Sequence, residues 1–390
     1  MKIVSLTLKN WMNFRDLTDV PLHTRNYVIG ANAVGKSNFL DMFRFLRDVA
    51  APAGAKPTAG GLQDAINRRG GISKLRCLHG KKDTEVVLDV TVQDGDDRWR
   101  YVLGFKGEGR ANNRVLIRKE SVYKNGEPLE QCQRPDDKDN QDQDRLTATY
   151  LQNPNDNKEF RCLAHYFSTI TYLHLVPQLL KFGDEIGGNR LTRDPFGQGF
   201  LQRIAETPGK TQGARLKRIQ SALGLVVPEF EELTFEQDAI TGAPHLKVNF
   251  KHWRQKGAWQ QEKQFSDGTL RLIGLLWSLM DGDSLLLLEE PELSLNEEIV
   301  RRLPQLIRHV LKSGKYPDRQ VVVTTHSEAL LSDQSIGAEA VIRFVSTNDG
   351  AVLRPADESE AFMLNSGFSV GQALLPALKP NGVEQLVLGI

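Results

Sequence analysis

Residues 30–37 read GANAVGKS, and they follow the short apolar run YVI at residues 27–29. The stretch fits the pattern GxxxxGK[ST], in which glycines let backbone N–H groups approach the phosphates of a nucleotide. In this pattern Lys36 reaches the β- and γ-phosphates, and the Ser37 hydroxyl ligates magnesium. Apolar residues after Lys36 recur with a period of 3.6, so the sequence predicts the strand, loop and helix that the motif requires.

The loop and the start of the following helix hold the residues that we expect to bind ATP. A helix N-terminus favours negative charge, because its free amides and its dipole point at a bound phosphate. A glycine-rich turn with a purely structural role would not require Lys and Ser at its last two positions. The expected contacts to ATP are made by Gly30, Asn32, Gly35, Lys36, Ser37 and Asn38, and magnesium is the second expected cofactor, with Ser37 as one ligand.

Two glutamates follow a run of leucines in LLLLEEPELSL at residues 285–295. Such a run predicts a strand buried on both faces of a parallel sheet, so Glu289 and Glu290 emerge at its carboxyl end, where open α/β sheets place ligands. By analogy with phosphoryl-transfer sites, we expect Glu289 to hold magnesium, directly or through water. Glu290 is then the catalytic base that orients and deprotonates the attacking water. Two exposed glutamates that only end a strand are the plainer alternative, which the neighbouring motifs disfavour.

Two further polar segments complete the set. VVVTTHS at residues 321–327 predicts another buried strand, and it brings the catalytic candidate His326 to the same sheet edge, to contact the γ-phosphate or align the water. FSDG at residues 265–268 precedes an apolar helix and places small polar residues at a second helix N-terminus suited to a phosphate. The nucleotide-binding candidates in this segment are Ser266, Asp267 and Gly268.

Together these motifs resemble ABC-type ATPase heads, and most closely the soluble RecF-like group that includes the heads of SMC and Rad50 proteins and the small AAA-type ATPases of bacterial defence systems. The resemblance rests on NWMNF at residues 10–14, GANAVGKSN, FSDGTLRLIGLLWSL, EEPELSL and TTHS. It implies an α/β P-loop NTPase fold with a mostly parallel core sheet, an antiparallel β lobe and an inserted helical lobe. It also implies hydrolysis of ATP to ADP and phosphate.

The two helix N-termini bear on the number of subunits. One γ-phosphate has no room for both of them if they come from distant segments of the same subunit. In the group that the chain resembles, ATP is held between two heads, so Ser266 and Gly268 would contact the γ-phosphate of the opposite subunit. The resemblance therefore implies a homodimer that closes on ATP, or a higher oligomer.

The chain departs from the family pattern at several positions. Glu289-Glu290 replaces the commoner Asp-Glu pair, which lengthens the reach to magnesium. Asn296 stands where the small defence ATPases often carry His, and Met12 stands where Rad50-like heads are often basic. The family's Q-loop glutamine is not evident, and the candidates for it are Gln152 and Gln178.

The motifs lie near the two ends of the chain, and Ser266 follows Gly30 by 236 positions. The expected parts are a discontinuous ATP-binding core of residues 1–60 and 260–360, an antiparallel β lobe with loops at 61–150, a helical lobe with a β-hairpin at 151–259, and a C-terminal tail at 361–390. We expect the tail to pack on its own core, with docking of a partner as the alternative. Pro and Gly at residues 51–61 predict a surface loop. Residues 133–145 hold almost no apolar side chains and predict a solvated loop that need not be ordered.

Charge balance and cysteine content exclude several classes. With 50 basic and 49 acidic residues, the formal net charge of +1 gives no global reason for binding nucleic acid or a membrane. Three cysteines suit neither a disulfide framework nor a zinc cluster. The sequence begins without a secretory signal and lacks any run of 18 apolar residues, so we expect a cytoplasmic protein with no membrane partner.

The leading functional hypothesis is a homodimeric ATPase that regulates a separately encoded, nuclease-like effector in bacterial anti-phage defence or DNA maintenance. Only 64 residues follow His326, which are too few for a fused nuclease domain. No sustained heptads indicate an SMC arm.

A RecF-like DNA-binding repair clamp without a dedicated effector is the alternative, since basic residues cluster in two places. One cluster comprises Lys251, His252, Arg254, Lys256 and Lys263 with Trp253 and Trp259, and the other comprises Arg68, Arg69, Lys74 and Arg76. Such clusters are more often ordinary solvated faces. A transporter ATPase subunit is disfavoured, because the motif separation is too long and FSDG differs from the signature of transporters.

Overall fold

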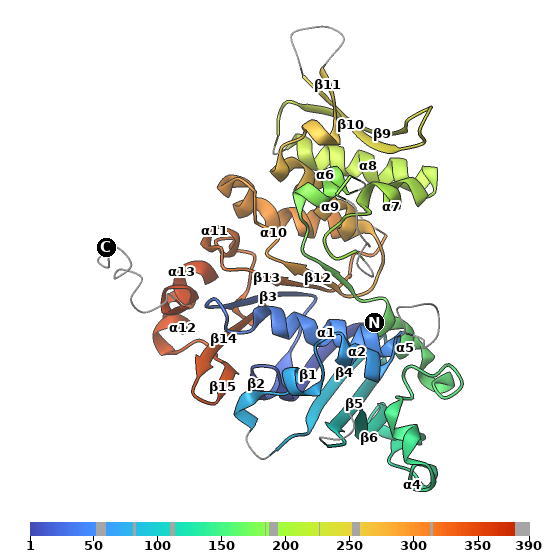
Figure 1. Ribbon diagram of the computed structural model, residues 1–390. Coiled ribbons are helices and arrows are strands. Elements are labelled where there is room, and N and C mark those ends of the chain that lie inside the picture. The colour runs from blue at the N-terminus through green and yellow to red at the C-terminus, as the bar shows by residue number, and fades with distance from the viewer. Residues whose placement is uncertain are drawn as a thin grey trace, which may run out of the picture.

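Two six-stranded sheets enclose the helix α1 (Lys36–Ala50), and a lobe of helices with a three-stranded sheet lies above them in Figure 1. The computed structural model describes residues 1–51, 60–80, 83–109, 114–183, 185–186, 194–225, 227–251, 258–312 and 315–378. Most of the predicted surface loop at 51–61 lies outside these residues, as do residues 252–257 of the first basic cluster.

The main sheet has the strand order β15-β14-β3-β13-β12-β8. Its strands are β3 (Arg25–Gly30), β8 (Thr171–Leu173), β12 (Leu286–Glu289), β13 (Val321–Thr324), β14 (Val341–Thr347) and β15 (Gly350–Leu353). All neighbouring strands pair in parallel except β14 and β15, which are antiparallel. The predicted mostly parallel core sheet is confirmed, and strands from both ends of the chain form its centre.

The leucine run before Glu289 is explained by burial on both faces of this sheet. Leu285 and Leu287 belong to the core that contains α1, whereas Leu286 and Leu288 belong to the core on the opposite face. Successive side chains of a strand point to opposite faces, so a strand covered on both sides must be apolar at every position. The first polar residue, Glu289, therefore marks the edge where the strand leaves the core.

The second sheet is antiparallel throughout and has the strand order β2-β1-β4-β5-β6-β7. Its strands are β1 (Lys2–Trp11), β2 (Phe14–Pro21), β4 (Val86–Asp94), β5 (Asp97–Gly107), β6 (Val115–Lys124) and β7 (Glu127–Arg134). The predicted antiparallel β lobe is present. The opening strand of the chain, β1, pairs within it rather than within the main sheet.

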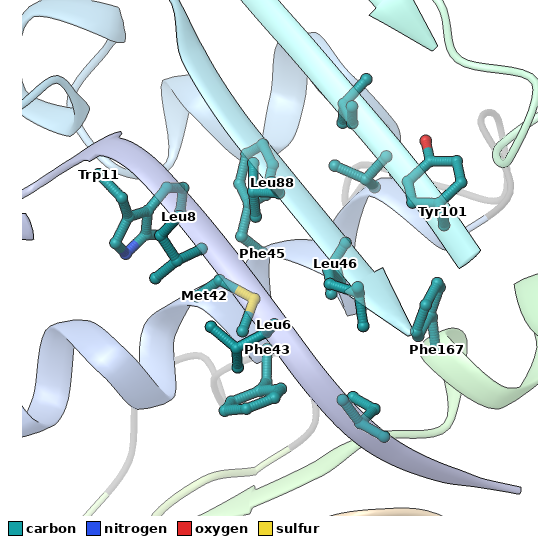
Figure 2. Close-up of a cluster of buried hydrophobic side chains, with 14 of the residues drawn as sticks. Leu6, Leu8, Trp11, Met42, Phe43, Phe45, Leu46, Leu88, Tyr101 and Phe167 are labelled. Carbon is teal, nitrogen blue, oxygen red and sulfur yellow. The ribbon is translucent and has the colours of Figure 1, made fainter. Parts of the chain in front are cut away.

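Side chains of α1 fill the space between the two sheets, as Figure 2 shows for the side that faces the antiparallel sheet. Trp11 of β1 meets Phe45 of α1 edge-on, with 5.1 Å between the ring centroids. Phe45 also stacks on Phe105 of β5 at 5.6 Å. Aromatic pairs of this kind contribute about 0.5–1.5 kcal/mol beyond their buried area. The helix α1, which begins at the phosphate loop, is thus packed against the antiparallel sheet by these aromatic contacts.

The opposite face of the main sheet is covered by helices of the second core. The helices and strands of this part and its neighbours are α5 (Arg161–Ser168), α6 (Pro177–Phe182), α7 (Phe200–Glu206), α8 (Gly209–Gly224), β9 (Phe230–Gln237), β10 (Pro244–Phe250), β11 (Ala258–Gln261), α9 (Asp267–Met280) and α10 (Glu297–Lys312). The three strands form a small antiparallel sheet in the order β11-β10-β9, which extends the predicted hairpin by one strand. Figure 1 shows α9 above the main sheet and α1 below it.

The prediction for residues 133–145 is confirmed in part, because most of these residues are exposed, but the segment is not a loop without order. This segment forms α4 (Asp137–Gln141) and a short 3₁₀ helix at Gln143–Thr147. Asp136 and Asp139 cap α4 reciprocally, and the side chain of Asp139 is buried beside Arg134. The segment is ordered by caps and ion pairs, which a count of apolar residues does not detect.

The remaining helices complete the two ends of the core. They are α2 (Leu62–Asn67), α3 (Ile72–Leu75), α11 (Glu328–Leu331), α12 (Glu358–Asn365) and α13 (Val370–Leu374). Val370, Ala373 and Leu374 are buried in the core that contains α9, so the described part of the C-terminal tail packs on its own protein as expected. Among the helices that the structure describes, none is both long and apolar enough to span a membrane.

Candidate active site at the carboxyl edge of the main sheet

The phosphate loop connects the end of β3 to the start of α1. Ala33 has φ 61° and Gly35 has φ 110°, so the backbone turns through left-handed conformations before the helix begins. The side chain of Asn13, from the β1–β2 turn, donates a hydrogen bond to the Val34 carbonyl. A Cβ atom at Gly35 would overlap this Asn13 side chain, which explains why the position requires glycine.

Lys36 folds back over the loop. Its Nζ donates hydrogen bonds to the carbonyls of Gly30 at 2.9 Å and Ala31 at 3.3 Å, and its side chain is almost fully buried. Burial lowers the pKa of Lys36, while the carboxylates of Glu290 and Glu289 oppose this shift. Within the described residues, its hydrogen-bond partners are these loop carbonyls, and a buried ammonium placed in this way is suited to a multiply charged anion.

Ser37 and Glu289 meet across the edge of the sheet. The Ser37 hydroxyl donates a hydrogen bond to Glu289 Oε1, and the Tyr172 hydroxyl donates one to Glu289 Oε2. Hydroxyl and carboxylate oxygens are the ligands that Mg²⁺ prefers, together with phosphate oxygens and water. The donor set therefore fits the predicted magnesium ligands, and Ser37 and Glu289 would hold the ion.

Tyr172 is a site residue that the sequence did not single out. It lies on β8, the strand next to β12, and the guanidinium of Arg44 stacks over its ring at 4.3 Å from the centroid. Burial raises the pKa of Tyr172, so its hydroxyl stays protonated and acts as a donor to Glu289. A single tyrosine in a three-residue strand carries no pattern that would have revealed this contact.

Glu290 and His326 also lie together. His326 follows β13 and Glu290 follows β12, which are adjacent parallel strands, and the distance from His326 Nδ1 to Glu290 Oε1 is 3.2 Å. The two side chains are 53% and 26% exposed, respectively. Solvent can therefore reach the carboxylate, as a base that activates water requires.

The predicted nucleotide-binding residues of the FSDG segment, called the signature segment below, lie at the N-terminus of α9. Ser266 caps this helix by accepting a hydrogen bond from the Thr269 amide at 3.1 Å. Asp267 accepts hydrogen bonds from Lys181 at 2.6 Å and from Gln178 at 3.1 Å. A Cβ atom at Gly268 would lie 2.7 Å from the Ser294 carbonyl, so the helix end lies directly against the segment after the carboxylates.

The signature segment and the phosphate loop are not brought together within one chain. None of the hydrogen bonds and ion pairs of the described residues joins Ser266, Asp267 or Gly268 to residues 30–38. The helices that carry them, α1 and α9, pack on opposite faces of the main sheet.

The other predicted positions have mainly structural contacts. Gln152 accepts a hydrogen bond from the Leu62 amide at 3.0 Å, and Gln178 binds Asp267, so neither glutamine binds Ser37 or Glu289 in the described chain. Asn296 caps the first turn of α10 by accepting from the Glu298 amide at 2.9 Å. In the phosphate loop, Asn32 is exposed, whereas Asn38 donates to Asn13 at 2.9 Å.

A protein-family model matches most of the chain. The family described as "AAA domain, putative AbiEii toxin, Type IV TA system" matches residues 25–332, from β3 through α11 and thus through all four motifs. The chain belongs to this family. A search of curated proteins found no match.

The fold of this AAA-domain protein is similar to that of a solved SMC head. It is similar to an Smc head described as bound to the C-terminal winged-helix domain of ScpA, with a TM-score of 0.52 and 15% identity over 93% of this chain and 100% of that one. The SMC head domain from Thermotoga maritima has a TM-score of 0.47 and 15% identity over 92% and 100% of the two chains. The family is that of an AAA domain, and the fold is that of an SMC head, which is a P-loop NTPase fold.

Proposed function

We propose that this protein hydrolyses ATP with Mg²⁺ and that its carboxylates Glu289 and Glu290 divide the work between metal binding and water activation. The observation that carries the proposal is the contact between Ser37 and Glu289, with Glu290 and His326 at the same sheet edge. The contact joins the phosphate loop to the carboxylate pair.

Each residue has a defined task in this mechanism. Lys36 would bind the terminal phosphates. Ser37 and Glu289 would hold Mg²⁺, which when bound would supply positive charge to stabilise the transferring phosphoryl group. Glu290 accepts the proton of the attacking water, and His326, 3.2 Å away, keeps that carboxylate directed at the water. Tyr172 holds the second oxygen of Glu289 and leaves the first for the ion.

The proposal includes a homodimer that closes on ATP. Support comes from the opposite placement of α1 and α9 on the main sheet, which leaves the N-terminus of α9 without a phosphate from its own chain. Ser266 is exposed at that N-terminus. A second copy would bring the nucleotide held in its own phosphate loop to Ser266 and Gly268. Each copy would then complete the site of the other.

The cycle of closing and opening would regulate a separate effector protein in defence or DNA maintenance. The family description, which names a toxin and a toxin–antitoxin system, supports the defence role. That an Smc head is described in complex with a domain of ScpA supports the idea that a head of this fold can bind a partner protein.

The DNA-clamp alternative loses part of its support. Arg69, in the second basic cluster, is buried and binds Asp41 at 2.6 Å and Asp48 at 3.1 Å, so it is not available to a phosphate backbone. Binding of duplex DNA in the presence of ATP, with affinity that falls steeply between 50 and 200 mM salt, would restore the alternative.

The proposal is tested by measuring phosphate release and molar mass together. We expect ATP and Mg²⁺ to support hydrolysis whose rate per subunit rises with protein concentration, and light scattering to show a dimer when hydrolysis is blocked. A rate per subunit independent of concentration, with a monomer under all conditions, would contradict the dimer. Absence of hydrolysis at any concentration would contradict the enzyme.

A further inference from the structure

The catalytic candidate Glu290 has an unusual backbone conformation. Its φ is 44°, in the left-handed region that a residue with a side chain rarely adopts. Its amide donates a hydrogen bond to the Thr324 carbonyl at 3.1 Å, which continues the pairing of β12 with β13. The turn aims the Glu290 side chain at His326. The conformation of this one residue thus sets the direction of the proposed base.

Arg271 contacts that turn from the other side. It lies in the second turn of α9, is 4% exposed, and donates a hydrogen bond from Nη2 to the Glu290 carbonyl at 3.1 Å. The backbone of Glu290 is therefore held by hydrogen bonds at both its N–H group and its carbonyl. A planar guanidinium on a packed helix is a rigid support for such a carbonyl, unlike a lysine ammonium, which rotates freely.

Glu292, two residues after Glu290, is a second buried ionisable side chain in this region. Its side chain is 7% exposed, and its Oε1 accepts a hydrogen bond from the Thr325 hydroxyl at 2.6 Å. Among the described residues, Glu292 Oε2 and Arg271 Nε are buried without a hydrogen-bond partner. Burial lowers the pKa of Arg271, while the carboxylates of Glu292 and Glu290 oppose this shift. Burial of ionisable groups costs desolvation free energy, which the hydrogen bond of Arg271 to the Glu290 carbonyl offsets in part.

Thr325 extends the network to His326. The Thr325 hydroxyl, besides donating to Glu292, accepts a hydrogen bond from the Ser327 amide at 3.0 Å. The segment of residues 325–327 is therefore held by Glu292, whereas Glu290 is held by Arg271. Each member of the Glu290–His326 pair thus depends on a buried side chain outside the pair.

We propose that Arg271 is a positioning residue, which holds the backbone of Glu290 in its left-handed conformation and so directs the catalytic carboxylate of its own chain at His326. Glu292 acts with it by fixing Thr325 and the His326 segment. This inference rests on the proposed function, in which Glu290 is the base of ATP hydrolysis. It does not require Arg271 to touch ATP.

The first test replaces Arg271 with Met, which keeps the length of the side chain and removes its donors. We expect kcat to fall on the order of 100-fold, as for a base displaced by about 1 Å. The Kd for a fluorescent ATP analogue should stay within about threefold of wild type, because Lys36 and Ser37 are untouched. Arg271→Lys should recover only a small part of kcat, since it restores the charge without the fixed donor geometry.

Arg319→Met is the matched control. Arg319 is also a buried arginine that binds backbone carbonyls, with Nε 2.9 Å from the Ser284 carbonyl and Nη1 2.6 Å from the Ser278 carbonyl. It lies against the other end of α9, away from Glu290. This variant should unfold at lower denaturant concentration but keep the kcat of wild type. If Arg271→Met folds poorly, the double variant Arg271→Met/Glu292→Gln removes both charges and should show the same loss of kcat.

Mixed dimers separate an effect on Glu290 from an effect on the signature. Wild-type heads are mixed with Lys36→Ala heads, which supply Ser266 but bind no ATP. Adding Arg271→Met to the Lys36→Ala head should leave the rate unchanged, because Arg271 acts within the head that hydrolyses ATP. Adding it instead to the ATP-binding head should lower the rate as in the Arg271→Met homodimer.

Three results would overturn the inference: an unchanged kcat in Arg271→Met, an equal loss of kcat in Arg319→Met, or a loss of rate when only the Lys36→Ala head carries Arg271→Met. A wild-type protein that does not hydrolyse ATP is a different result, since it contradicts the proposed function itself and the inference with it.

Discussion

Ser37 donates a hydrogen bond to Glu289, although 252 residues separate the two in the chain. Ser37 lies in the first turn of α1, between the two sheets, and Glu289 ends β12, the strand beside β13. Their contact is possible because β3 and β12 flank β13, so that both strands end at one edge of the main sheet. The folding of the central sheet is therefore what assembles the proposed metal site.

Tyr172→Phe tests how this site is held. Loss of the hydroxyl leaves Glu289 Oε2 without its donor, so the carboxylate can rotate away from Ser37. We expect the Mg²⁺ concentration for half-maximal ATPase activity to rise about 10-fold, as when other outer-shell contacts of metal ligands are removed. Tyr166→Phe is the control, because Tyr166 is equally buried and its hydroxyl binds Gln320 at 3.4 Å, outside the site. Equal Mg²⁺ requirements in both variants would contradict the role of Tyr172.

Glu290→Gln separates ATP binding from hydrolysis. The amide keeps the size of the side chain but cannot accept a proton, so we expect hydrolysis to fall by about 10²–10⁴. Binding of ATP should persist, since Lys36, Ser37 and Glu289 are unchanged, and a closed dimer should accumulate in size-exclusion chromatography. The matched control is Glu298→Gln, at an exposed position in the first turn of α10. Wild-type turnover by Glu290→Gln would show that another group is the base.

The sequence predicts the carboxylate edge well because of how β12 is buried. A short run that is apolar at every position favours a strand covered on both sides, and the first polar residues after it then stand at the sheet edge. The same argument places His326 after β13. The prediction works because burial on both faces removes polar residues from the strand itself, and local sequence records this directly.

What the sequence does not predict depends on contacts between distant segments. Tyr172 reaches Glu289 only because β8 adds to the sheet beside β12, and strand order is not written in either strand. Arg271 looks like one polar residue in an apolar helix until the structure shows the Glu290 carbonyl beside it. Arg69 looks like part of a basic surface, but Asp41 and Asp48 neutralise it in the interior.

Because the carboxyl group of Glu120 is buried in the β lobe, we expect the free energy of unfolding to depend on pH. Burial raises the pKa of Glu120 to about 7, against the opposing effects of the Tyr150 amide, the Arg134 charge and the Tyr101 hydroxyl. The native protein therefore binds the proton more tightly than the unfolded chain does. Stability from this group is complete below the unfolded pKa of 4.5 and is lost as the pH rises through about 7, to a total of about 3 kcal/mol.

Denaturant unfolding from pH 4.5 to pH 8 measures this loss. Glu120→Gln does not titrate, so its free energy of unfolding should fall less than that of wild type over the same range. Parallel curves for the two proteins would show that Glu120 keeps the same protonation state in the folded and unfolded chains.

If each active site is shared between two subunits, two inactive variants should recover ATPase activity when they are mixed. Lys36→Ala removes the ammonium that binds the terminal phosphates, so this head binds no ATP but still presents Ser266. Ser266→Arg places a bulky side chain at the N-terminus of α9, so this head binds ATP but cannot close on a partner's nucleotide. In a mixed dimer, the Ser266→Arg head binds ATP and the Lys36→Ala head supplies an intact signature, so one complete site forms.

Each variant alone should be inactive. In an equimolar mixture, half of the dimers are mixed and each mixed dimer has one site, so the mixture should recover about one quarter of the wild-type rate. A mixture as inactive as its parts, from heads that are shown to exchange, would mean that each chain completes its own site.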